Sequence, residues 1–197
     1  YYGGRLDIVP VRHQLEALPP APRQDTWTTF ISSTRMGFVS VKAERRAAHL
    51  KSNRREAETV ARIIHTITAL HPDSPLSETG KHIGIIVPFR AQIAMIRKAL
   101  AAADIPGGGD ITIDTVERYQ GSQRDVIIFS TTVSRPDQLP VLSEPAMTEG
   151  QAVDRKLNVA VTRARQQFFM VGDEELLRQC EAYRDFLDFL KDGQIFR

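Results

Sequence analysis

Two polar stretches of the chain hold residues whose types and spacing could do chemistry. The first, TVERYQGSQRDVIIF at 115–129, places a polar turn with one glycine directly before an apolar run. The second, DRKLNVAVTRARQQFFMV at 154–171, places two arginines two residues apart before another apolar run. Such runs are typical of parallel strands covered on both faces, and chemistry in open α/β sheets collects in the loops at strand ends. The turn and the arginine pair are therefore candidate site residues.

The second stretch predicts an amphipathic helix of about ten residues that leads into the strand FFMV. At about 100° per residue, its apolar residues form one stripe of Leu157, Ala160, Val161 and Ala164. Arg163 and Arg165 then fall on opposite flanks, because residues two apart on a helix do not share a face. Their roles should therefore differ. The simpler alternative is that both are solvated, which is common for arginine beside an apolar stripe.

The sequence lacks the motifs of a chain that binds a nucleotide by itself. SETGKH has Gly80 and Lys81 but neither the first glycine nor the hydroxyl of a P-loop. GGGD follows a predicted helix instead of opening one, so it is no dinucleotide fingerprint. The acids at 173–175 suit the positive end of a helix dipole better than a magnesium site. The five histidines have no ligand spacing, so no metal site is predicted.

Composition favours a soluble, intracellular globular protein with no membrane partner. The chain has 197 residues, 42% of them apolar, and its runs are far shorter than the ~20 apolar residues of a membrane span. The single Cys180 excludes an internal disulfide and suits a reducing, cytoplasmic compartment. Of 26 basic residues 20 are arginine, which pairs bidentately with phosphate, although biased codon usage would give the same excess. The start without methionine predicts a piece of a longer protein.

The first half of the chain predicts a connector followed by alternating elements. Residues 1–24 hold four of the 11 prolines and should form an extended connector, with one domain over 25–197. TWTTFISS predicts a strand, and the basic segment after it a hairpin or surface excursion. Asn53 and Glu56 resemble a capping box that starts a helix ending near Leu70. HIGIIV then predicts a buried strand, which Pro88 ends before the next helix.

The second half continues the alternation. ITIDTV and DVIIFSTTV predict two strands, and the proline-bearing stretch 134–151 predicts a long loop. After the helix and the strand FFMV, closing helices follow with Asp173 as a cap. Strands and helices in alternation predict an α/β fold, a mostly parallel sheet flanked by helices on both faces.

Four motifs in this order, YYGGRL, VPFRAQ, TVERYQGSQRD and LNVAVTRAR, resemble the second (C-terminal) RecA-like domain of superfamily-one DNA and RNA helicases. The closest branch includes the nonsense-mediated decay helicase and its DNA-acting relatives. VPFRAQ resembles motif IV of the family, and the last two stretches resemble motifs V and VI. The resemblance implies an ATP cleft between two RecA-like domains, of which the absent first one brings the P-loop and the magnesium acid. A RecA-like domain without its own P-loop is therefore expected.

The resemblance also implies roles for residues of motifs V and VI. Arg163 would be the catalytic arginine finger, which places positive charge on the γ-phosphate in the transition state. Nucleotide-binding roles are implied for Gly121, Gln123 and Arg165, with Arg165 in orientation or interdomain pairing. Gln123 departs from the glutamate usual in the family, and it keeps a hydrogen-bond acceptor while losing the charge.

Contacts with single-stranded DNA or RNA are implied on the other side of the same motifs. The residues concerned are Pro88, Phe89, Thr115 and Gln120. Thr115 and Gln120 would link the nucleic-acid groove to the nucleotide side. A phenylalanine after a buried strand is also an ordinary core residue, so Phe89 has two interpretations.

The leading interpretation is the C-terminal motor domain of an ATP-dependent helicase or translocase. ATP and magnesium would be held mainly by the N-terminal RecA-like domain of the same protein, so this fragment alone should be inactive. The alternative is a nonhydrolysing relative that binds nucleic acid or acts as a scaffold, for which Gln123 is the main support. A small-molecule enzyme has little support, because no nucleophile and base share a turn.

Overall fold

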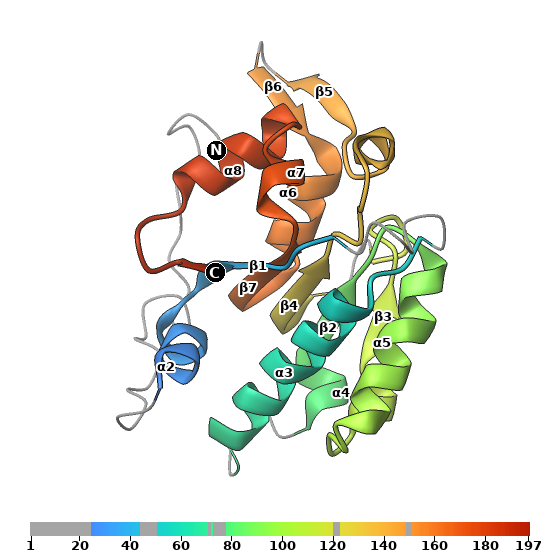
Figure 1. Ribbon diagram of the computed structural model, residues 1–197, viewed down its shortest axis with the longest axis vertical. Helices are drawn as coiled ribbons and strands as arrows, with labels where there is room; N and C mark the ends of the chain where they lie inside the picture. The colour runs from blue at the N-terminus through green and yellow to red at the C-terminus, as the bar shows by residue number, and fades with distance from the viewer. Residues whose placement is uncertain (1–24, 44–50, 71, 73–77, 120–122, 149–150) are drawn as a thin grey trace.

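The computed structural model describes residues 25–43, 51–70, 72, 78–119, 123–148 and 151–197. Six parallel strands form one sheet in the order β3-β2-β4-β7-β1-β8, and β5 and β6 form a separate antiparallel ribbon (Figure 1). The strands are β1 Met36–Ser40, β2 Ile83–Ile86, β3 Thr112–Asp114, β4 Arg124–Ser130, β5 Pro145–Thr148, β6 Gln151–Asp154, β7 Ala164–Gly172 and β8 Ile195–Phe196. The α-helices are α2 Thr26–Ser33, α3 Arg54–Leu70, α4 Thr79–His82, α5 Arg90–Ala102, α6 Arg155–Thr162, α7 Glu174–Leu177 and α8 Glu181–Phe189. Two 3-10 helices are η3 Gly108–Asp110 and η4 Pro136–Val141.

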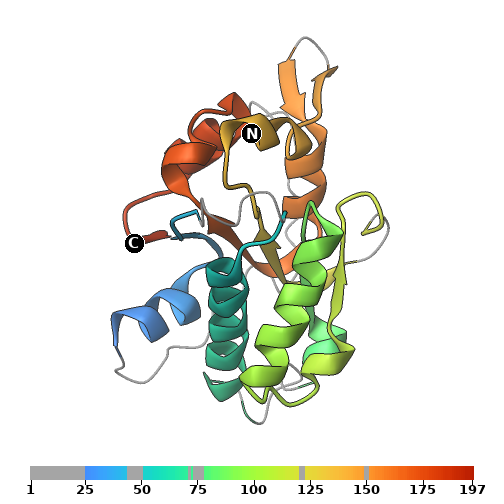
Figure 2. The ribbon, with the colours of Figure 1, turned by 45° about the vertical axis from the view of Figure 1, so that its right-hand side comes forward.

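Helices cover the sheet on both faces, as predicted. Successive side chains of a strand point to opposite faces, so each strand contributes to two cores. On one face Val39, Ile85 and Ile128 pack under α2, α3 and α5. On the other face Phe129 and Met170 pack under α6 and α8. Figure 2 shows α3 and α5 side by side on their face of the sheet. The predicted α/β RecA-like fold is confirmed.

The predicted start of α3 is confirmed in detail. Asn53 Oδ1 accepts from the Glu56 main-chain N–H at 3.2 Å, and Asn53 Nδ2 donates to Glu56 Oε1 at 3.1 Å. The helix runs to Leu70, where the sequence pattern ends it. The predicted strand HIGIIV corresponds to β2, and Asp173 caps α7 by accepting from the Leu176 N–H at 3.3 Å.

Two predictions for the first elements are wrong. Residues 26–33 form the helix α2 instead of a strand, because Trp27, Phe30 and Ile31 recur at helical spacing and are buried against the sheet. In the segment after them Met36–Ser40 forms neither a hairpin nor a surface excursion, since it is the strand β1 between β7 and β8 inside the sheet, while residues 44–50 lie outside the described residues. Strand pairing on both sides of β1 outweighs the weak local pattern of a five-residue run.

The end of α6 also differs from the prediction. The helix stops at Thr162 and Arg163 is its C-cap, while Ala164 and Arg165 already belong to β7. The helical projection therefore does not apply to Arg165. Pairing of Ala164 with Arg124 of β4 ends the helix here, and no glycine or proline announces it.

The stretch 134–151, predicted as a long loop, contains η4 and most of the β5–β6 ribbon. In Figure 1 this ribbon projects from the top of the molecule. The predicted connector at 1–24 lies outside the described residues. Within the described ranges no helix is long and apolar enough to cross a membrane.

Candidate nucleotide and nucleic-acid site

Three predicted site residues meet where β4 and β7 begin, here named the amino edge of the sheet. Gln123 directly precedes β4, Arg163 directly precedes β7, and Arg165 is the second residue of β7. Arg165 Nε donates to Gln123 Oε1 at 3.5 Å, a long and exposed contact. The Arg124 N–H donates to the Arg163 carbonyl at 3.0 Å. Pairing of β4 with β7 therefore brings the turn residue Gln123 and the arginine pair together.

Arg163 has a half-buried side chain that is left available to a ligand. Its Nε donates to the carbonyl of Val159, one turn earlier in α6, at 3.4 Å. It forms no ion pair with any residue that the structure describes. The terminal nitrogens of the guanidinium can therefore meet an anion that arrives at the amino edge.

An irregularity in strand pairing sets the direction of Arg165. Arg124 pairs with Ala164 and Val126 with Gln167, so β7 holds one residue more than β4 over this interval. A bulge of this kind bends a strand and turns its side chains. Arg165 lies inside the irregularity, which leaves its side chain exposed and beside Gln123.

The three described residues among the predicted nucleic-acid contacts lie at the opposite, carboxyl edge of the sheet. Pro88 and Phe89 follow β2, and Thr115 follows β3. The Val87 N–H donates to the Asp114 carbonyl at 3.0 Å, which holds the ends of the two strands together. β4 has seven residues, and at about 3.3 Å each they span roughly 20 Å. The structure thus groups Pro88, Phe89 and Thr115, and separates them from Arg163 by the length of the strands.

Phe89 is mainly a core residue. Its side chain is 8% exposed and belongs to the apolar cluster on the α6 and α8 face. Lys51 Nζ lies over the ring, 5.6 Å from its centroid, in a cation–π contact. The ordinary core interpretation therefore applies to most of the ring, and its contact with a nucleic-acid strand stays a prediction.

Gln120 and Gly121 lie outside the described residues, but both flanks of their turn are described. On one flank Tyr119 is buried, with its hydroxyl 3.5 Å from the Thr112 carbonyl. Burial raises the pKa of Tyr119, against the nearby Arg124 cation and the hydrogen bond to Thr112. A Cβ atom at Gly84 would lie 2.0 Å from this hydroxyl, so the close approach requires glycine in β2.

On the other flank lies Arg124, which the motif comparison did not single out. Its Nη1 donates to the Gln123 carbonyl at 2.9 Å, and its Nη2 donates to Thr112 Oγ1 at 3.3 Å. The side chain crosses β2 at Gly84, where an added Cβ would lie 3.0 Å from Arg124 Cγ. No sequence signal separates this arginine from the many others, because the contacts with Thr112 and Gly84 depend on how β3 and β2 lie beside β4.

The predicted capping pair Asn53 and Glu56 belongs to a larger polar group at the carboxyl edge that the sequence did not indicate. It is named the Glu56 network and consists of Asn53, Glu56, Gln92, Ser130 and Thr132. Glu56 is fully buried, and its Oε2 accepts from Ser130 Oγ at 2.7 Å and from the Thr132 N–H at 2.8 Å. Gln92 Nε2 donates to the Asn53 carbonyl at 3.0 Å and to Ser130 Oγ at 3.1 Å. The network joins the starts of α3 and α5 to the end of β4.

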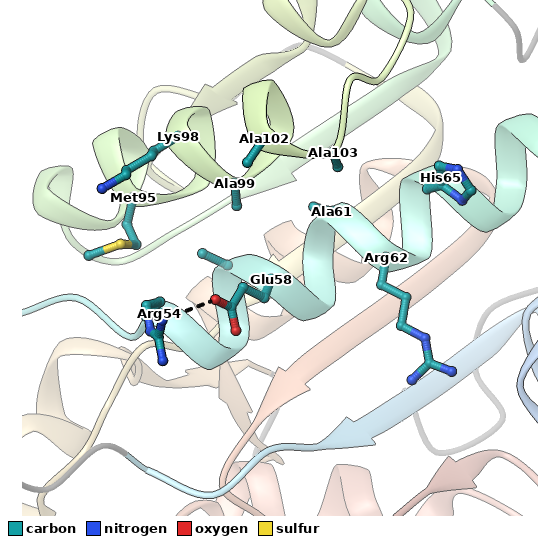
Figure 3. Close-up of a pocket in the computed structure, with 11 residues that line it drawn as sticks. Arg54, Glu58, Ala61, Arg62, His65, Met95, Lys98, Ala99, Ala102 and Ala103 are labelled. Atoms are coloured by element: carbon teal, nitrogen blue, oxygen red, sulfur yellow. Dashed lines mark ion pairs between the residues drawn. The ribbon is translucent and has the colours of Figure 1, made fainter.

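A groove on the outer surface of the helices is lined by none of the predicted site residues. It measures about 580 Å³ and runs between α3 and α5 (Figure 3). Alanines from the two helices line it, and Arg62 points away from α5. Arg54 at the start of α3 is part of its lining, but the lining contains no glycine turn that could approach phosphate groups, so the size of the groove does not make it the nucleotide site. Among the described residues no group of three or more His, Cys, Asp and Glu could hold a metal.

Comparison with known proteins shows the family to which the chain belongs. Residues 1–175 match the AAA domain family, and the chain belongs to that family. It is 30% identical over 150 residues to the DNA polymerase alpha-associated DNA helicase A of Schizosaccharomyces pombe, which covers 74% of this chain and 19% of the relative. The corresponding protein of Saccharomyces cerevisiae is 37% identical over 99 residues, 50% of this chain and 13% of the relative. Mouse 3'-5' exoribonuclease HELZ2 is 33% identical over 144 residues, 71% of this chain and 5% of the relative.

Among solved structures, the C-terminal domain of a possible DNA helicase from Lactobacillus plantarum is similar with a TM-score of 0.43 and 14% identity, over 80% of this chain and 91% of that one. This structural similarity is too low to support a conclusion about the chain. The chain spans between 5% and 19% of the length of the three sequence relatives. The predicted resemblance to the C-terminal RecA-like domain of helicases is confirmed by the family and these relatives.

Proposed function

We propose that the chain is the C-terminal motor domain of an ATP-dependent nucleic-acid helicase or translocase. The observation that supports it is the placement of Arg163 at the amino edge beside Gln123 and Arg165, half-buried and without an acidic partner among the described residues. A guanidinium in this state is suited to a phosphate delivered by another domain. The proposed task of Arg163 is to stabilise charge on the γ-phosphate as it is transferred.

ATP and magnesium fit this half-site only in part. The amino edge supplies two guanidinium groups and an amide, which suit phosphate and ribose oxygens. The magnesium acid and the phosphate loop would come from the N-terminal RecA-like domain. Magnesium would neutralise charge on the β- and γ-phosphates there, while Gln123 orients the nucleotide and Arg163 meets the γ-phosphate.

The carboxyl edge is the proposed surface for single-stranded DNA or RNA. Pro88 and Thr115 are half-buried there, and the exposed cations Lys51, Arg90 and Arg118 lie near them in sequence or contact. Phosphate contacts from such cations dominate binding of single strands without reading their sequence. Opening and closing of the cleft between the two domains would convert alternating binding and release of the strand into movement along it.

The test uses the longer protein that contains this chain. Arg163→Ala should lower strand-stimulated ATP hydrolysis by about a thousandfold or more, because arginine fingers contribute on that scale. Arg184→Ala is the matched control, since Arg184 is exposed on α8, where it pairs with Asp185 at 3.7 Å. ATPase activity of Arg163→Ala near that of the control would refute the finger assignment.

A nonhydrolysing binding or scaffold module is the second candidate, and Gln123 favours it. The amide retains only a 3.5 Å contact with Arg165 where a carboxylate would form an ion pair. Titration of the complete protein with ATP and a single strand separates the two functions. A scaffold would bind the strand and show no turnover at any strand concentration.

A further inference from the structure

We propose that Arg124 is a positioning residue of the nucleotide half-site, which fixes the Gln123 peptide through its side chain. The inference rests on the proposed nucleotide role of the amino edge. Arg124 does not itself face the γ-phosphate, because both of its terminal nitrogens are already engaged by partners within the fold. Its effect on a nucleotide would therefore pass through Gln123.

The geometry of the side chain supports this role. Arg124 Nη1 donates to the Gln123 carbonyl at 2.9 Å, which orients the peptide that precedes β4. Arg124 Nη2 donates to Thr112 Oγ1 at 3.3 Å on β3, the strand at the border of the sheet. One guanidinium thus ties the residue before β4 to a strand that is not its neighbour.

The position is built for arginine. The Arg124 side chain passes over Gly84, where any Cβ would lie 3.0 Å from Arg124 Cγ and closer still to Tyr119. Its Nε is buried and has no hydrogen-bond partner among the residues that the structure describes, a cost that a residue chosen for packing alone would avoid. A lysine could reach one of the two acceptors, but its single nitrogen lacks the fork that reaches both.

Main chain and side chain of Arg124 have separable tasks. The main-chain N–H donates to the Arg163 carbonyl at 3.0 Å, and any residue except proline retains that bond. Of these two parts of Arg124, the side chain is the one that contacts the Gln123 carbonyl. Removal of the side chain should therefore weaken ground-state binding of the nucleotide and leave the Arg163 contribution to kcat intact.

The experiment is a double-mutant cycle in the longer protein, read by titration with a fluorescent ATP analogue and by steady-state hydrolysis. Arg124→Ala should raise the Kd and the KM for nucleotide about tenfold, the scale of one lost hydrogen bond to a charged donor, with kcat within about twofold. Gln123→Ala should do the same, and the double variant should be no weaker than Gln123→Ala alone. Arg124→Lys should recover part of the affinity. Thr112→Val removes only the second acceptor and should have a smaller effect in the same direction.

Additive losses in the cycle would overturn the inference, as would an unchanged Kd for Arg124→Ala. A fall in kcat with an unchanged KM would also overturn it, because Arg124 would then act on the transition state. Absence of turnover together with a shifted Kd would overturn the proposed hydrolysis and support the positioning role. Failure of the unaltered protein to bind nucleotide would overturn both.

Discussion

Glu56 makes the stability of the fold dependent on pH. The carboxyl group is fully buried, and burial raises its pKa from 4.5 to about 8, against hydrogen bonds from Ser130, Thr132 and Asn53 that lower it. Between these two values the folded state holds the proton while the unfolded state has released it. Stability therefore falls as pH rises from about 4.5 to about 8, and above that range Glu56 adds no further dependence.

The size of the effect follows from the same two values. A tenfold change in proton affinity corresponds to about 1.4 kcal/mol, so the full window corresponds to at most roughly 5 kcal/mol of unfolding free energy. This is a large part of the roughly 5–15 kcal/mol of unfolding free energy that is typical of a folded domain. Glu56→Gln removes the titrating group, keeps the shape, and should flatten this part of the pH profile.

The assay is urea unfolding of the unaltered chain and of Glu56→Gln at pH values from 5 to about 9. The unaltered chain should lose several kcal/mol more than the variant over this range. Glu58→Gln is the control, because Glu58 lies on the same helix and is exposed in a surface pair with Arg54 at 3.6 Å. Parallel profiles for the unaltered chain and Glu56→Gln would refute the reasoning, since the buried carboxyl would then titrate alike in both states.

Two further predictions concern stability and use the same unfolding assay. Gly84→Ala should cost about 1–3 kcal/mol, because the new Cβ would lie 2.0 Å from the Tyr119 hydroxyl, whereas Gly109→Ala meets nothing within 4 Å and should cost far less; equal costs would contradict the close approach. Asp154→Ala should cost about 1–3 kcal/mol, because this buried carboxylate caps α6 at 2.8 Å and accepts two more hydrogen bonds at the base of the β5–β6 ribbon. The exposed Asp137→Ala serves as its control, and an equal loss there would remove the capping explanation.

Elements with clear end signals could be predicted from the sequence. The Asn53 and Glu56 pair marks the start of α3, and Asp173 marks that of α7, because capping depends on residues within one turn. Local signals failed where tertiary pairing decided the outcome. TWTTFISS has strand-forming residues but folds as α2, since Trp27 and Phe30 then face the same core.

The candidate site was predictable as a set of residues but not as an arrangement. The motif order led to Gln123 and Arg163, and the structure places both at the amino edge. The motif order could not show that Pro88 and Thr115 lie at the carboxyl edge, nor that α6 ends before Arg165. The roles of these residues stay predictions. The Arg124 contact with Thr112 and the bonds of Glu56 to Ser130 and Thr132 were missed, because these partners lie on other elements and no local spacing announces such contacts.

The distance between the two edges limits how the domain could transmit force. β2, β4 and β7 run from the amino edge to the carboxyl edge, and their middle residues are buried on both faces. Strands packed in this way neither stretch nor compress appreciably. A displacement applied beside Arg163 would therefore move Thr115 through a rigid-body rotation of the whole sheet. If the proposed motor function holds, the length of a mechanical step would then depend on the joint with the proposed N-terminal domain and hardly on deformation within this sheet.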